Sequence, residues 1–427
     1  MRVETEDGGS AADAPLQLGT NQAGMRAHNE RLVLSLVRRR GPLAKTEIAR
    51  LTGLSAQTVS VIMRKLESDR LLKRGEPQRG RVGQPSVPMA LDPEGAFFLG
   101  IKVGRRSFDL VVVDFAGVVR RQARERHAHP TPRDTVRRAL AAVAEAETSL
   151  GAAAERIAGL GIAMPFALWE WAEESGAPAA EAAAWRGADI RADIAAALPY
   201  PVYMRNDATA ACGAELAFGA GAELRDFLYF YVGAFVGGGL VLNGGLYAGR
   251  TGNAAALGSM PVRDARGRTV QLIDMASLAT LEERLRAAGI ANGALYDPAA
   301  DWSGFGAHLD AWIAEAASGM AQAVVAASAV IDLEAALIDG SFPPAVQARL
   351  IAATTAEMGA LDLSGLDPPA LRAGTLGPVA RALGGASLPL FDRYLIDQHA
   401  LAGPGTARPP DIGDRPARTQ SLAQGGG

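Results

Sequence analysis

Cysteine and histidine are scarce in this 427-residue chain, which has one cysteine and five histidines. A disulfide framework needs paired cysteines, and the common structural zinc sites need several cysteine or histidine ligands close together. The sequence therefore predicts no disulfide and no metal site, and we expect Cys212 to be a small packed residue. The N-terminus also lacks the basic and then apolar pattern of a secretory signal, so we expect a cytoplasmic protein.

Long apolar runs are also missing. The longest uncharged stretch covers residues 227–249, but it contains seven glycines, three of them consecutive at 237–239. Aromatic and β-branched residues precede this triplet, and an Asn-Gly-Gly turn signal follows it. The composition predicts a buried β-hairpin rather than a membrane span, and no helix follows the triplet as a dinucleotide site would require. We expect no membrane partner.

Net charge is small, at −3, but it is unevenly distributed along the chain. Residues 26–86 contain fourteen Lys or Arg and five Asp or Glu, a balance of +9, so the remaining residues together carry −12. A basic module of this size attached to a large acidic body is typical of proteins whose module binds a polyanion. The length predicts two or three domains.

The basic module reads as three helices followed by a two-stranded wing. Apolar residues predict a helix over residues 28–40, which Gly41-Pro42 ends, and a second helix from Thr46. Ser55 is a good N-cap for a third helix, whose apolar stripe is Val59, Ile62, Met63 and Leu66. A strand at residues 71–74, a Gly-rich turn and a returning strand complete a winged helix-turn-helix, which we assign to residues 26–92.

The third helix has a polar face that suits the major groove of DNA. Amide and hydroxyl groups reach base edges there, while Lys and Arg meet phosphates, and cations on the wing add phosphate or minor-groove contacts. The candidate DNA-binding residues are Gln57, Thr58, Ser60, Arg64 and Lys65 on the helix, with Arg79 and Arg81 on the wing. The alternative is a structural three-helix bundle whose polar face is only solvated.

From residue 97 onward strands alternate with helices. Residues 97–127 predict three antiparallel strands before an Ala-rich helix at residues 131–150, and a later hairpin, helices and strands repeat this order. We therefore expect residues 93–402 to form an α/β body of two lobes around a cleft. Residues 1–25 and 403–427 are aperiodic and rich in Gly, Pro or polar residues, so we expect disordered tails.

Three segments together resemble the ROK family of repressors, open reading frames and kinases. They read NERLVLSLVRRRGPLAKTEIARLTGLSAQTVS at residues 29–60, RNDATAACGAELAFGAG at residues 205–221 and VGGGLVLNGGLYAGRTGNAAALGSM at residues 236–260. The resemblance covers roughly residues 29–385. It implies a winged helix-turn-helix joined to a two-lobed actin-like sugar-kinase fold of the ribonuclease H-like type. In kinase members of the family, ATP and a hexose meet between the lobes.

This sequence departs from the kinase pattern at each catalytic segment. Lys102 replaces the family's metal-side carboxylate, and Phe235 stands inside the second phosphate loop, which is otherwise glycine-lined. Ala256-Leu257-Gly258-Ser259 lacks the family's Glu and His, and residues 264–273 lack every zinc-binding cysteine as well as a sugar-binding Glu. We therefore expect no catalytic residue, no metal and no cofactor.

Asn206 and Asp207 match the family's sugar-binding Asn and its catalytic base. Without a nucleotide, Asp207 can still accept hydrogen bonds from a polyol, so the resemblance makes both residues candidate ligand contacts. The alternative is that Asp207 only caps the following helix.

These observations predict a DNA-binding transcriptional regulator, acting as a repressor, whose degenerate kinase-like body binds a sugar or sugar derivative and oligomerises. Two heads on a homodimer or homotetramer would read an inverted repeat in a double-stranded operator. Two other functions stay open at this point: an ATP-dependent sugar kinase with an attached DNA-binding domain, and a ligand-free architectural DNA binder.

Overall fold

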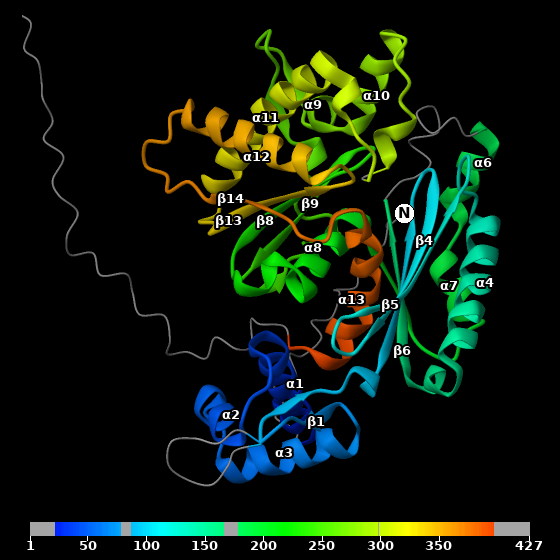
Figure 1. The fold of residues 1–427 in the computed structure, drawn as a ribbon, viewed down its shortest axis with the longest axis vertical. Coiled ribbons are helices and arrows are strands. Elements are labelled where there is room, and N and C mark those ends of the chain that lie inside the picture. The colour runs from blue at the N-terminus through cyan, green and yellow to red at the C-terminus, as the bar shows by residue number, and fades with distance from the viewer. Residues whose placement is uncertain (1–21, 78–86, 166–177, 298, 397–427) are drawn as a thin grey trace, which may run out of the picture.

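The computed structural model describes residues 22–77, 87–165, 178–297 and 299–396. They form a small helical head below a body of two lobes, each built on a five-stranded sheet (Figure 1). The predicted fold class, a winged helix-turn-helix followed by a two-lobed α/β body, is confirmed. The expected disordered tails fall mostly outside the described residues.

The head consists of α1 Gln22–Arg40, α2 Lys45–Thr52, α3 Ala56–Ser68, β1 Leu72–Arg74 and β2 Met89–Leu91. As predicted, Ser55 caps α3, since its hydroxyl accepts a hydrogen bond from the Thr58 backbone N–H at 3.1 Å. The predicted stripe of Val59, Ile62, Met63 and Leu66 is buried. The strands β1 and β2 pair antiparallel and form the wing. The helix α1 begins six residues before the predicted start.

The first lobe contains a sheet in the order β5-β4-β3-β6-β7. Its strands are β3 Phe97–Val103, β4 Ser107–Asp114, β5 Val119–Arg126, β6 Ile157–Met164 and β7 Val202–Asn206. Its outer face is covered by α4 Pro132–Leu150, with α6 Ala179–Ala183 and α7 Ile190–Ala195 nearby (Figure 1). The three predicted antiparallel strands and the Ala-rich helix are confirmed.

The second lobe repeats this plan in the order β10-β9-β8-β13-β14. Its strands are β8 Phe227–Val232, β9 Val236–Leu242, β10 Gly245–Leu246, β13 Ala335–Gly340 and β14 Ala370–Ala373, with a separate pair, β11 Pro261–Arg263 and β12 Thr269–Gln271. Its helices are α9 Ile273–Ala276, α10 Leu278–Ala287, α11 Gly306–Ser328 and α12 Pro344–Gly359. Each sheet therefore has three antiparallel strands followed by two parallel strands.

The long uncharged stretch forms the predicted buried hairpin of β8 and β9. The glycine triplet allows close packing on both sides of β9. A Cβ atom on Gly239 would lie 2.3 Å from the Cβ of buried Cys212, and one on Gly238 would lie 2.3 Å from a methyl of Leu257. No helix in the described ranges is long and apolar enough to cross a membrane.

Two helices, α8 Asp207–Phe218 and α13 Ala380–Tyr394, lie side by side between the two sheets (Figure 1). The sequence prediction missed α13, because Gly384, Gly385 and Pro389 are typical of loops. Here the glycines let the helix touch other backbone. A Cβ atom on Gly161 of β6 would lie 1.9 Å from the carbonyl oxygen of Gly385, so α13 packs directly on the sheet.

The head and the first lobe share one hydrophobic core. Val33 and Val37 of α1 belong to the same buried cluster as Phe98 of β3, Phe115 after β4 and Leu390 of α13. The aromatic rings of Phe115 and Tyr394 meet edge to face, with centroids 5.0 Å apart. The head is therefore packed against the body rather than tethered by a linker alone.

Candidate nucleic-acid interface and lobe junction

The helix α3 lies on the side of the head that is farther from both lobes (Figure 1). Gln57, Arg64 and Lys65 are exposed, and Thr58 and Ser60 are half-buried at its edges. Lys65 pairs with Asp69 one turn later, at 2.5 Å. The structure therefore brings the five predicted helix residues onto one solvent-facing surface.

Local contacts distinguish these residues. The Thr58 hydroxyl shares a hydrogen bond with the Ser55 hydroxyl at 2.8 Å, so Thr58 belongs to the helix cap as well as to the surface. The Arg64 guanidinium donates back to the Ser60 carbonyl at 3.2 Å. Arg79 and Arg81 lie outside the described residues, so their predicted contribution stays a prediction.

One arginine joins the head to the body. Arg38 of α1 donates to the Phe115 carbonyl, and its guanidinium carbon lies 5.6 Å and 5.9 Å from the ring centroids of Phe115 and Phe218. Burial lowers the pKa of Arg38 to about 10, although Asp114 opposes this shift. Because Phe218 is the last residue of α8, this contact links the head to a helix that begins between the lobes.

Further hydrogen bonds fix the same orientation. Arg39 donates to the Ala222 carbonyl at 3.0 Å, and the Ile396 backbone N–H donates to the Ser35 hydroxyl at 3.1 Å. Arg156 of the first lobe donates to the Asp69 carbonyl, at the end of α3, at 2.9 Å. The head is therefore held by contacts to both lobes and to the segment that follows α13.

The two segments that match phosphate loops touch each other. Arg105, in the turn between β3 and β4, lies over the ring of Phe235 in the turn between β8 and β9, with the guanidinium carbon 3.4 Å from the ring centroid. Next to it, Arg106 pairs with Glu282 of α10 at 3.2 Å. These contacts connect the lobes through the two turns that the resemblance matches to phosphate loops.

Lys102, which the resemblance matches to the metal-side carboxylate of the kinases, also makes a structural contact. Its ammonium group lies 2.9 Å from Asp109, and both side chains are buried. Burial lowers the pKa of Lys102 to about 8, and the nearby cation Arg381 acts in the same direction. Asp109 also accepts from Arg124, so this carboxylate holds two cations.

Asp207 does not cap α8, which corrects one of the two sequence interpretations. Asn206 is the cap, since its side-chain oxygen accepts from the backbone N–H groups of Ala208 and Thr209 at 3.0 Å and 3.2 Å. Asp207 is the first helical residue, and its carboxylate accepts a hydrogen bond from Arg381 of α13 at 3.1 Å. This ion pair is 13% exposed at the aspartate and 16% exposed at the arginine.

Arg381 joins α13 to α8 and to the second lobe, and the sequence analysis missed it. Its guanidinium carbon lies 4.6 Å from the ring centroid of Tyr231 at the end of β8, while its Nε has no hydrogen-bond partner. Burial alone would lower the pKa of Arg381, but Tyr231 and Asp207 raise it. The sequence carries no signal for this role, because Arg381 lies beyond the family motifs, at the start of the unpredicted α13.

Another buried carboxylate lies in the second lobe. Asp339 of β13 accepts from the Tyr229 hydroxyl at 3.1 Å and from the Gly377 backbone N–H at 3.0 Å. Burial, with the negative charge of Glu215, raises the pKa of Asp339 to about 7. Glu215 of α8 accepts in turn from the backbone N–H groups of Thr375 and Leu376. These bonds fix the segment between β14 and α13.

The loop that matches the family's zinc motif is held by hydrogen bonds. Asp264 accepts from the backbone N–H groups of Arg266 and Arg268, each at 2.9 Å, and pairs with the Arg268 side chain at 2.7 Å. Within the described ranges, no three His, Cys, Asp or Glu side chains group together as a metal site would require.

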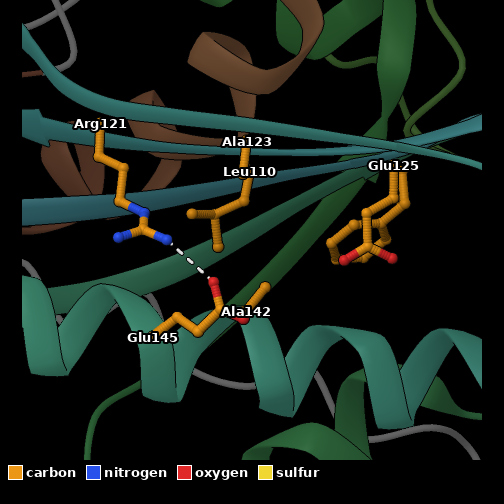
Figure 2. A pocket seen from close by; sticks show the side chains of 7 residues that line it. Leu110, Arg121, Ala123, Glu125, Ala142 and Glu145 are labelled. Carbon is orange, nitrogen blue, oxygen red and sulfur yellow. Dashed lines mark hydrogen bonds and ion pairs between the residues drawn. The ribbon is translucent and has the colours of Figure 1, made fainter.

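A small pocket lies elsewhere, on the outer face of the first lobe. Figure 2 shows it between β4, β5 and α4, lined by Leu110, Ala123 and Ala142. An ion pair between Arg121 and Glu145, 2.9 Å long, crosses it. The pocket is separate from the lobe junction, and none of the predicted site residues lines it.

Comparisons with known proteins agree with this geometry. Residues 98–273 match the ROK family, and residues 26–81 match the MarR family. The chain is 27% identical over 381 residues to an uncharacterised protein of Sinorhizobium fredii, covering 89% of this chain and 94% of that protein. It is 33% identical over 115 residues to a transcriptional regulator of Mycobacterium tuberculosis, of which the match spans only 25%.

Two solved structures share the fold. A ROK family transcriptional regulator, a homolog of the E. coli MLC protein, has a TM-score of 0.64 at 20% identity, covering 88% of this chain and 98% of that one. A ROK family glucokinase from Streptomyces griseus, in complex with glucose and AMPPNP, has a TM-score of 0.54 at 22% identity, covering 69% and 99%. The second match leaves out about a third of this chain. The two-lobed body of this chain therefore matches the ROK family over residues 98–273, and its N-terminal helix-turn-helix matches the MarR family over residues 26–81.

Proposed function

We propose that this protein is a DNA-binding transcriptional regulator that acts as a repressor in the cytoplasm. The observation that carries the proposal is the solvent-facing surface of α3, where Gln57 and Arg64 stand exposed on a winged helix-turn-helix. An amide at this place can read an adenine edge, and the neighbouring cations can meet phosphates. The +9 balance of residues 26–86 supports a polyanionic partner.

The body supports sensing better than catalysis. Phosphoryl transfer needs a bound nucleotide, a metal-associated carboxylate and a base near the sugar hydroxyl. In this chain Phe235 and Arg105 stack where the nucleotide would lie, Lys102 replaces the carboxylate, and Arg381 pairs with Asp207. We propose that the body binds a sugar or sugar derivative near Asn206 and Asp207 without phosphorylating it.

Two helices can carry the effect of such a ligand to the head. Asp207 and Arg381 stand at the first turns of α8 and α13. About 17 and 20 Å farther along these helices, at 1.5 Å per residue, Phe218 and Tyr394 lie next to the head. A ligand whose hydroxyl groups donate hydrogen bonds to Asp207 competes with Arg381, so it favours a different placement of the two helices. Operator affinity changes only through such a difference between two arrangements.

We further propose a homodimer or homotetramer, because two heads related by a two-fold axis would read an inverted repeat. Half-sites would then lie about one helical turn, or a multiple of it, apart. The partner is a double-stranded operator.

Selection of duplexes from a random-sequence library, followed by fluorescence anisotropy, tests the proposal. We expect a specific duplex whose affinity falls steeply with salt. The Gln57→Ala variant should relax base preference at one position, whereas Arg64→Ala should weaken binding to all sequences and reduce the salt slope by about one. Arg186→Ala, on an exposed turn of the first lobe, is the control, and it should change neither the base preference nor the affinity for DNA. If the wild-type chain selects no duplex at low salt, the proposal fails.

The alternative function is an ATP-dependent sugar kinase with an attached DNA-binding domain, which the retained Asn206-Asp207 pair favours. A coupled assay for ATP-dependent phosphorylation across a hexose panel decides between them. We expect no turnover. Turnover that Asp207→Asn abolishes would establish the kinase and overturn the sensing role.

A further inference from the structure

The exposed face of α3 holds an apolar side chain that none of the predicted contacts includes. Val61 is 42% exposed, whereas Val59, two residues earlier, is fully buried. At 100° per residue, Val61 falls between Gln57 and Lys65, about 40° from each, near the middle of the surface opposite the buried stripe.

This position gives Val61 no role in the core of the head. A β-branched residue is also a weaker helix former than alanine, so neither packing nor helix propensity explains a valine there. Single exposed apolar residues are common on protein surfaces, and by itself the exposure points to no partner. What sets Val61 apart is its place on the helix face that the proposed function assigns to base contacts.

Resting on that proposed function, we propose that Val61 reads the C5 methyl group of a thymine in the major groove. Thymine is the base that presents an apolar group there, and aliphatic side chains contact it. Gln57 lies four residues before Val61, about 6 Å along the helix axis, and its amide matches adenine. With base pairs about 3.4 Å apart, the adenine read by Gln57 and the thymine read by Val61 lie within about two base pairs of each other.

Deoxyuridine tests this contact, because it removes the methyl group and leaves every hydrogen-bonding atom of the base pair. The probe is the duplex that the wild-type chain selects from a random-sequence library, with each thymine replaced by deoxyuridine in turn. At one salt concentration, the wild-type chain is expected to lose about four-fold in affinity at one thymine of each half-site, as for one buried methylene group.

Three variants complete the test. Val61→Ala should bind the thymine duplex about four-fold more weakly than wild type and should not distinguish deoxyuridine at the sensitive position. Val61→Ile should keep that distinction. Gln57→Ala is the matched control on the same helix face, and it should keep the thymine preference while losing the adenine preference. Unchanged helical circular dichroism shows that each variant is folded.

The outcomes separate this inference from the proposed function. If the wild-type chain binds a specific duplex but tolerates deoxyuridine at every position, Val61 reads no methyl group and the regulator function stands. The inference is also overturned if the Val61→Ala variant still loses about four-fold in affinity when deoxyuridine replaces the sensitive thymine. If the wild-type chain selects no duplex, both fail together.

Discussion

Replacing either member of the Asp207–Arg381 ion pair should destabilise the body unequally. In Asp207→Asn, the Arg381 guanidinium stays largely buried, with the ring of Tyr231 beside it and its Nε already unpaired. In Arg381→Met, the Asp207 carboxylate still accepts a hydrogen bond from the Ala208 backbone N–H. It also still interacts favourably with the positive end of the α8 dipole. The first change should therefore cost more than the second.

Breaking a buried ion pair costs about 3–5 kcal/mol, and the remaining exposure of both groups places this pair at the lower end. We expect about 3 kcal/mol for Asp207→Asn and about 2 kcal/mol for Arg381→Met. The double variant removes both charges together, so it should cost about 2 kcal/mol less than the sum of the single changes.

Urea unfolding of the four proteins, followed by circular dichroism, measures this coupling energy. The control is Arg137→Met, which breaks a solvent-exposed pair with Asp134 in the same lobe and should cost less than about 0.5 kcal/mol. Additive single changes would refute the reasoning, because Asp207 would then be independent of Arg381. The same Arg381→Met variant should also gain thermal stabilisation by polyols, since the carboxylate is released.

Three other predictions concern the rest of the body and its junction with the head. Arg38→Ala should lower the free energy of unfolding by about 2–4 kcal/mol and speed proteolysis between head and body, whereas Arg40→Ala, on the exposed end of α1, should do neither. Because the pKa of Asp339 rises from 3.8 to about 7 on folding, its contribution to stability is fully present below pH 4 and is lost as pH rises through 7. Asp339→Asn should therefore remove on the order of 4 kcal/mol of pH dependence from urea unfolding between pH 4 and 7, and an unchanged pH profile would contradict the assignment. Gly239→Ala should cost about 3 kcal/mol through overpacking against α8, whereas Gly293→Ala, with open space around it, should be neutral; equal effects in thermal melts would count against this packing.

Sequence periodicity was sufficient for the head and for most of the strands. The stripe of Val59, Ile62, Met63 and Leu66 and the cap at Ser55 are local signals, because one helix turn contains all that defines them. The repeated order of strands in the body follows in the same way, and both sheets confirm it.

The features of the fold that periodicity could not predict depend on long-range packing. The helix α13 forms despite Gly384, Gly385 and Pro389, because backbone from β6 and α8 fills the space that side chains would need. Arg381 approaches Asp207 only because α13 lies beside α8, a separation of 174 residues along the chain. Two adjacent polar residues, Asn206 and Asp207, precede the Ala-rich part of α8. No local signal in the sequence shows which of them is the N-cap.

The core that the head shares with the first lobe limits how this architecture can be rearranged. A fragment cut after Leu91 would expose to water the apolar side chains of α1 that now pack against Phe98, Phe115 and Leu390. Chimaeras that graft this head onto another sensor would thus need the part of the first lobe around Phe98 and Phe115 and the end of α13 as well.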